Sequence, residues 1–178
     1  EYCSESEVAY GSGVCNLVAW AIYDQGPGDV DFVLFTADMC GDDIPEDAGF
    51  SASIASSAID GNPSLVTMII PGQIVQLTLE EAVDTALSFK PDAYPYAAGL
   101  RYSVDGNEPF GSRVFDLELL TRDGGWSTFD PSSSYKVLTL VDIATGRDDA
   151  FAAILNADSG SITDLPRRPS EMLLSYAE

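Results

Sequence analysis

Histidine is absent from this sequence of 178 residues, and lysine and arginine together number only 8. Without histidine, a serine or cysteine nucleophile lacks its usual general base, and a zinc site would need aspartate or glutamate to complete it. The longest apolar runs, such as LVTMII and FAAIL, fall far short of the roughly 20 residues that span a bilayer. These absences argue against catalysis by histidine and against a membrane span. Because the sequence starts at Glu1 without methionine, we expect a processed protein or a piece of a longer one.

Positive charge is scarce and also unevenly placed. The 29 acidic residues give a net charge of -21; residues 1–89 hold 15 acids and no base, and residues 90–178 hold 14 acids and all 8 bases. Nucleic-acid binding depends on Lys and Arg beside phosphates, so this charge excludes nucleic acid and repels anionic lipid. Such acidity is typical of solubility in a salty or extracellular medium, and we expect an extracellular or cell-surface protein.

The acidic stretch GDDIPED, residues 41–47, suggests a second interpretation of the negative charge, namely a calcium site. Calcium prefers several converging carboxylate oxygens, but the spacing here departs from the EF-hand loop. We predict no cofactor in this chain apart from a weak calcium candidate at this stretch, whose ligands would be Asp42, Asp43, Glu46 and Asp47.

Three cysteines lie in the first quarter of the chain, and none forms a CxxC pair. One disulfide with one further thiol fits a secreted protein, whereas three buried reduced thiols would fit a reducing compartment. Cys15 and Cys40 are the disulfide candidates, although spacing leaves the pairing open. Cys3 would then be available for a covalent link to another copy or domain.

The hydrophobic pattern mixes helical and strand spacing. Residues 14–22 place apolar side chains at helical intervals, and residues 31–37 form a continuous apolar run typical of a buried strand. Thr78 followed by acids predicts a helix N-cap. The predicted helices are 7–25, 51–59, 78–89, 149–155 and 170–177; the predicted strands are 31–37, 64–70, 73–77, 98–104, 112–120 and 135–143. This predicts one α+β domain over residues 1–178, with mixed, largely antiparallel sheets covered by helices.

A series of motifs in the second half has a recognisable order. GLRYSVD is followed by P-x-GSRV, by W-x-x-x-DP-x-x-x-Y-x-V and by D-x-A-x-G-x-D-D-x-F. This series resembles the C-terminal domain of the 5'-nucleotidase family. NLVAWAI, DFVLFTADMCGDDI, QIVQLTLEEAVDTAL and TDLPRRPSEMLLSYAE are similar to further parts of that domain, so the resemblance covers nearly the whole chain.

The resemblance implies a division of labour between two domains. In that family an N-terminal metallophosphatase domain holds two metal ions and hydrolyses the substrate, while the C-terminal domain grips the nucleoside. Two-metal chemistry needs a full ligand set, and this chain, which has no histidine, matches the C-terminal domain alone. We therefore expect no hydrolysis by this chain by itself.

The resemblance also implies where a ligand would bind. The loop that supplies an asparagine and an arginine in the family reads FTADMCGDDI here, so an acidic loop replaces a cation. The two rings that stack on the base are replaced by aliphatic residues, and stacking contributes about 1 to 3 kcal/mol per base. By this resemblance Thr36 or Ala37 falls at the asparagine, and residues 40–42 fall at the arginine. The candidate ligand-binding residues are Thr36 and Asp38 in the loop, Met68 (or a neighbour) and Ile143 at the ring positions, and Asp148 or Asp149 at the ribose-binding aspartate. We therefore expect a fold retained without its usual ligand.

Three functional hypotheses remain, and the third is a calcium-stabilised assembly subunit that uses the acidic stretch at residues 41–47. The first is a non-catalytic secreted or surface module with a structural or protein-binding role. The second is the nucleoside-specificity domain of a larger 5'-nucleotidase-type hydrolase, with Arg101, Arg147 and tyrosines lining the cleft. Partners would be other proteins or neighbouring domains of a longer chain.

Several prominent side chains have a simpler structural reading. We expect Arg101 and Arg113 to pair with acids such as Asp105 and Asp116. The tyrosines Tyr94, Tyr96 and Tyr102 are expected to pack rather than to form a ligand platform. The expected core aromatics are Trp20, Trp126 and Phe129.

Overall fold

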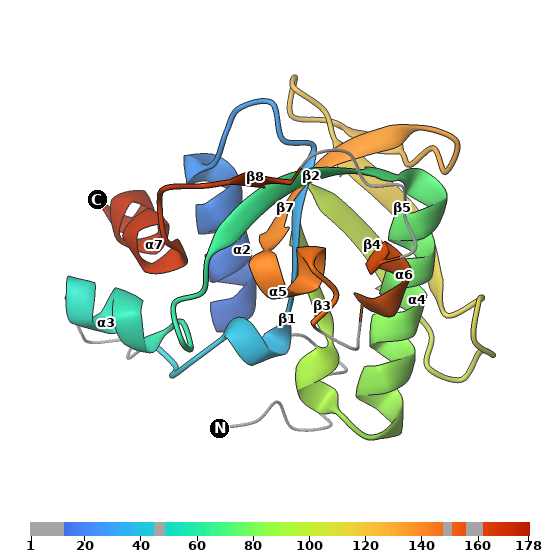
Figure 1. Cartoon of the computed structure of the whole chain (residues 1–178), viewed down its shortest axis with the longest axis horizontal. Helices are drawn as coiled ribbons and strands as arrows, with labels where there is room; N and C mark the ends of the chain where they lie inside the picture. Colours follow the sequence, from blue (N-terminus) through green and yellow to red (C-terminus); the bar gives the residue numbers. More distant parts are fainter. Residues whose placement is uncertain (1–12, 45–48, 148–150, 156–161) are drawn as a thin grey trace.

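The computed structural model describes residues 13–44, 49–147, 151–155 and 162–178, and it is built around one five-stranded sheet (Figure 1). The strand order is β3-β1-β7-β2-β8, with β1 and β7 parallel and the other neighbours antiparallel. A smaller antiparallel sheet has the order β4-β5-β6. The predicted α+β class with mixed sheets is thus confirmed.

The strands are short, and most follow the predicted segments. Their bounds are β1 Phe32–Thr36, β2 Leu65–Pro71, β3 Pro95–Ala98, β4 Leu100–Val104, β5 Val114–Leu120, β6 Trp126–Thr128, β7 Ser134–Leu140 and β8 Thr163–Asp164. All five residues of β1 are buried, as the continuous apolar run predicts. The strands β6 and β8, with three and two residues, were not predicted.

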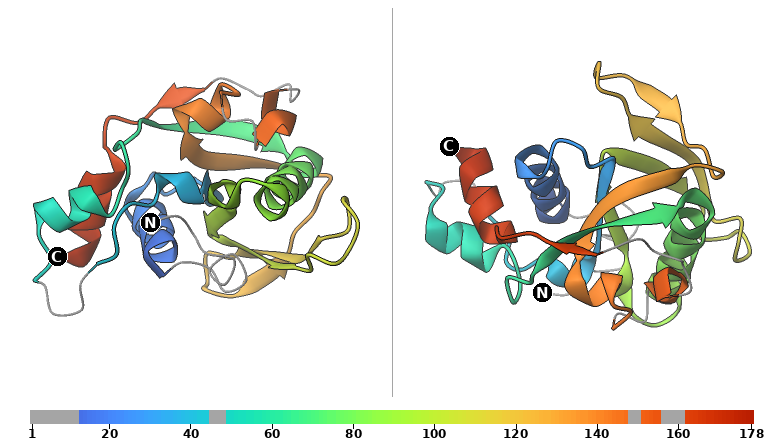
Figure 2. Two further views of the ribbon diagram at one scale, coloured as in Figure 1. Left: turned by 90° about the horizontal axis from the view of Figure 1, so that it is seen from below. Right: turned by 45° about the horizontal axis from the view of Figure 1, so that its top comes forward.

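Helices cover the sheets on two sides. In Figures 1 and 2, α2 and α7 lie side by side, and α4 packs beside α6 at the other side of the molecule; the contacts between these helices agree. The helices are α2 Gly13–Gln25, α3 Ala52–Ser57, α4 Gly72–Ser88, α5 Val141–Ala144, α6 Ala152–Leu155 and α7 Pro169–Ala177, with 3-10 turns η1 Ala37–Met39 and η2 Pro91–Ala93. Part of the first predicted helix, residues 7–12, and the start of the one at 149–155 lie outside the described residues.

The longest helix differs from its prediction. The helix α4 begins at Gly72, so the predicted strand over 73–77 and the predicted N-cap at Thr78 are wrong. The β-branched pair Ile74 and Val75 favours a strand locally, but Val75 also starts a helical series of buried side chains that continues through Leu79 and Ala82. Burial of this longer face outweighs the local preference.

Two predicted strands differ from the observed ones. A change of direction at Gly99, whose φ is +81°, splits the predicted strand 98–104 between β3 and β4. The strand β7 ends at Leu140, and Ile143 lies in the short helix α5. The early end of β7 delivers the chain to the region described next.

Candidate functional site at one end of the central sheet

The carboxyl ends of β1 and β7 meet at the same edge of the central sheet. These two strands are parallel, with Phe32 opposite Val137, while β2 and β3 run the other way and therefore begin at this edge. Four segments converge there: 36–42, 57–64, 91–95 and 141–147. We call this region the sheet end. Open α/β sheets place ligands beyond the carboxyl ends of their strands, so the sheet end is the candidate site.

The structure brings two predicted site residues together after β1. Thr36 is buried, and its hydroxyl donates a hydrogen bond to the carboxylate of the exposed Asp38. The backbone N–H of Ala37 donates to the carbonyl oxygen of Tyr94 at 2.9 Å, which fixes this turn against the start of β3. Thr36 and Asp38 therefore lie at the sheet end.

The other two described positions are inside the core. Met68 lies opposite Val137 in the middle of β2 and is 1% exposed; Ile143 lies in α5 and is fully buried. Neither side chain presents a face to solvent, so neither replaces a stacking ring at the surface here. Asp148 and Asp149 lie outside the described residues, and a ligand role for all these positions stays a prediction.

The part of the chain that reaches the sheet end ahead of β2 is residues 60–64, which sequence reasoning missed. The backbone N–H of Val141 donates to the carbonyl oxygen of Ser64 at 3.0 Å, which ties this segment to α5. Gly61 and Asn62 both have positive φ, at 60° and 42°. The turn signal DGNP marks this segment in the sequence.

The arginines divide between the sheet end and the rest of the molecule. Arg147 lies at the sheet end, where its guanidinium pairs with Asp142 at 3.1 Å. Arg168, the N-cap residue of α7, also reaches it by donating to the Ser64 hydroxyl at 2.5 Å. Arg101 follows the opposite end of β3, so the predicted cleft joining Arg101 to Arg147 does not form.

The predicted ion pairing of Arg101 and Arg113 is confirmed, but its partners are different. Arg101 binds Glu118 at 2.7 Å from Nε, and its guanidinium lies 4.3 Å from the centroid of the Trp126 ring. Arg113 pairs with Asp84 on α4. The expected partners Asp105 and Asp116 were wrong because proximity in sequence does not give proximity across a hairpin with a bulge.

Three tyrosines pack together at the start of β3 and on β4. The rings of Tyr94 and Tyr96 meet edge to face with centroids 5.6 Å apart, and the hydroxyl of Tyr102 donates to the carbonyl oxygen of Pro95. Burial raises the pKa of Tyr102 well above its usual value, with smaller contributions from Tyr94 and Tyr96; burial also raises the pKa of Tyr94. This arrangement is the predicted packing.

The three aromatic residues expected in the core differ in their burial. Phe129 is buried, Trp126 is partly covered and Trp20 is 38% exposed. The core prediction for Trp20 is therefore wrong.

Comparison with known proteins agrees with the fold. The family model for the 5'-nucleotidase, C-terminal domain, matches residues 5–155. This chain belongs to that family.

The relatives of this 5'-nucleotidase C-terminal domain are longer proteins. It is 30% identical over 126 residues to a probable 5'-nucleotidase of Treponema pallidum (strain Nichols), covering 69% of this chain and 21% of that protein. The structure of a 5'-nucleotidase precursor from Thermus thermophilus superimposes with a TM-score of 0.81 at 23% identity, over 93% of this chain and 32% of that one. The NAD nucleotidase of Haemophilus influenzae gives a TM-score of 0.77 at 23% identity, over 92% and 29%. At this identity the structural matches establish the fold alone.

A disulfide joins the sheet end of this 5'-nucleotidase C-terminal domain to its first described helix. Cys15 in α2 is bonded to Cys40, with Cα atoms 5.5 Å apart. Cys40 also pairs with Ile59 through an isolated β-bridge. The two disulfide candidates are therefore partners, and Cys3 lies outside the described residues.

The calcium prediction falls partly outside the structure. Asp42 and Asp43 are exposed, and Glu46 and Asp47 are not described. Over the described ranges, no three His, Cys, Asp or Glu side chains gather as a metal site would require. No described helix is long and apolar enough to cross a membrane.

Proposed function

We propose that this 5'-nucleotidase C-terminal domain is a non-catalytic module, secreted or held at the cell surface, with a structural or protein-binding role. One observation carries the proposal: at the positions where the family would grip a nucleoside, Met68 and Ile143 are buried in the core. The loop after β1 also carries three carboxylates, those of Asp38, Asp42 and Asp43, and it contains no Lys or Arg between residues 36 and 44.

The physical consequence is a weak grip on nucleotides. Each lost aromatic stack removes about 1 to 3 kcal/mol of binding free energy. A carboxylate in place of a cation also reverses the local field beside a phosphate. Arg147, which does lie at the sheet end, already has Asp142 as a counter-ion.

A second function is favoured by two other observations. The chain spans only 21% of its curated relative and about a third of the Thermus structure, so it corresponds to one part of a larger 5'-nucleotidase. Arg168 brings a further cation to Ser64 at the sheet end. The alternative is therefore a nucleoside-specificity domain whose metal-bearing domain belongs to the rest of a longer chain.

Isothermal calorimetry with adenosine and with AMP separates the two functions. We expect no heat of binding at millimolar ligand, in buffer with calcium and moderate salt. Heat with either ligand that disappears in Asp149→Ala, but persists in Asp116→Ala on β5, would establish the alternative.

The proposed location is tested independently by measuring the amount of the protein in the medium, on the cell surface and inside the cell. Protein found only inside the cell would contradict the proposed location.

A further inference from the structure

A tight turn on the loop between β4 and β5 displays one phenylalanine. The N–H of Ser112 donates to the carbonyl oxygen of Pro109 at 3.0 Å, and Gly111 has φ of +91°, as the third residue of a type II turn requires. Phe110 is the second residue of this turn, and half of its surface is exposed. The ring therefore stands at the tip of a turn of defined geometry.

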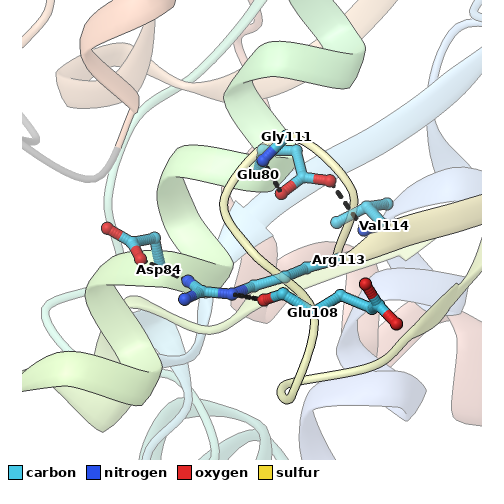
Figure 3. Close-up of polar contacts among 6 residues, drawn as sticks. All are labelled: Glu80, Asp84, Glu108, Gly111, Arg113 and Val114. Carbon is cyan, nitrogen blue, oxygen red and sulfur yellow. Dashed lines mark hydrogen bonds and ion pairs between the residues drawn. The ribbon is translucent and has the colours of Figure 1, made fainter.

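A buried carboxylate fixes this turn to α4. Glu80 is only 2% exposed, and its two oxygens accept the N–H groups of Gly111 at 3.0 Å and Val114 at 2.7 Å (Figure 3). A buried charge is costly unless its oxygens are paired, so both bonds oppose movement of the turn. Arg113 adds an ion pair to Asp84 and a 2.8 Å bond from Nε to the carbonyl oxygen of Glu108.

The loop that carries Phe110 also borders apolar area and carries negative charge. Leu87 of α4 is 44% exposed and lies against the loop, where a Cβ on Gly106 would come within 3.2 Å of its side chain. Glu108 is exposed, and its carboxylate points away from Arg113 in Figure 3. Among the described residues no hydrogen bond or ion pair to that carboxylate is formed, while Asp84 neutralises Arg113. We call Leu87, Glu108 and Phe110 the hairpin knob.

We propose that the hairpin knob docks into a protein partner that offers an apolar pocket for Phe110 and a Lys or Arg for Glu108. This inference rests on the protein-binding role proposed above and assigns that role a surface. A rigidly held aromatic side chain makes a favourable anchor, because little conformational entropy is lost on binding. A second copy of this chain is a poor partner, since each copy carries a net charge of -21.

Site-specific photocrosslinking tests the knob in the complete protein, produced in its own cells. The photoreactive residue p-benzoylphenylalanine replaces Phe110 in one variant and Phe115 in a matched control. Phe115 is also exposed, at 44%, and lies on β5 beyond the turn. We expect an adduct from position 110 alone, joined to a partner peptide that contains Lys or Arg. Adding Glu108→Lys should lower the yield of this adduct roughly tenfold, because the attraction between residue 108 and the partner's Lys or Arg becomes repulsion.

The outcomes separate this inference from the proposed function. Equal adduct yields at positions 110 and 115, or a yield at position 110 that Glu108→Lys does not change, would contradict the hairpin knob as the docking surface. Either result would still be compatible with a protein-binding module. Adducts at neither position would also overturn the knob. If adenosine binding were found in addition, the proposed function would fail as well. Glu80→Gln provides a second check, since a loosened turn should reduce crosslinking at 110 while leaving the chemistry of that position unchanged.

Discussion

Three acidic side chains of α4 hold two other parts of the chain. Glu80 accepts bonds from Gly111 and Val114, Glu81 accepts the N–H of Ala153 at 2.8 Å, and Asp84 pairs with Arg113. The sequence predicts Glu80 and Glu81 as first-turn partners of a helix dipole. The actual role of the three acids depends on segments 29 to 72 residues away, which local pattern cannot reveal.

Replacing the buried carboxylate should have a measurable cost. Glu80→Gln keeps the size of the side chain but sets an NH2 group against one of the two backbone N–H donors. Hydrogen bonds to charged groups contribute about 1.5–3 kcal/mol, so we expect a loss of that order in the free energy of unfolding. Urea denaturation measures it. The control Glu118→Gln, which breaks a pair on the exposed sheet face, should cost less than about 1 kcal/mol; equal losses would contradict a special role for Glu80.

At the scale of elements, the sequence predicts the types of most segments better than their limits. The strand β1 is recognisable as a short continuous apolar run, and α2 is recognisable because its apolar residues recur at helical spacing. The start of α4 is missed because Ile74 and Val75 fit either period, and only the sheet beneath shows which one is buried.

The candidate site is predictable to the extent that it follows directly from a strand. Thr36 is the last residue of β1 and Asp38 lies two residues beyond it, so resemblance alone places them at the sheet end. Met68 was assigned a ligand position, but pairing with Val137 puts it mid-strand. Its register depends on contacts between β2 and β7, about 70 residues apart, which the motif itself does not contain.

The break between β3 and β4 depends on a single glycine. Gly99 has φ of +81°, and a Cβ there would lie 2.5 Å from the Tyr23 ring and 2.8 Å from the carbonyl oxygen of Asp31. Gly124 has nearly the same φ, +83°, but no atom within 4 Å of such a Cβ. Gly124→Ala should therefore cost about 1–2 kcal/mol for backbone strain alone. Gly99→Ala should cost about 1–3 kcal/mol more because of the overlap. Urea midpoints of the two variants make the comparison, and equal losses would show that the packing at Gly99 relaxes freely.

For the whole molecule, the disulfide restricts the unfolded chain. Cys15 and Cys40 are separated by 25 residues, and closing a loop of this size stabilises a protein by about 3 kcal/mol. We expect a reductant, or Cys15→Ser with Cys40→Ser, to lower the free energy of unfolding by that amount. Reductant added to the double variant is the control and should change nothing. A wild-type protein unaffected by full reduction would contradict this expectation.

The net charge of -21 opposes compaction of the whole molecule, because like charges repel at distances that salt can screen. We expect the melting temperature to rise with NaCl and to rise equally with CaCl2 and MgCl2 at matched ionic strength. The reason is that screening depends on the ionic strength and not on which divalent cation supplies it. A bound ion behaves differently, since it stabilises by about 2.7 kcal/mol at a hundred times its Kd and does so selectively. The melting temperature could instead rise specifically with calcium, with the rise reversed by a chelator and absent from the double variant Asp42→Asn, Asp43→Asn. That result would place a calcium site on residues 41–47 and contradict screening as the sole effect.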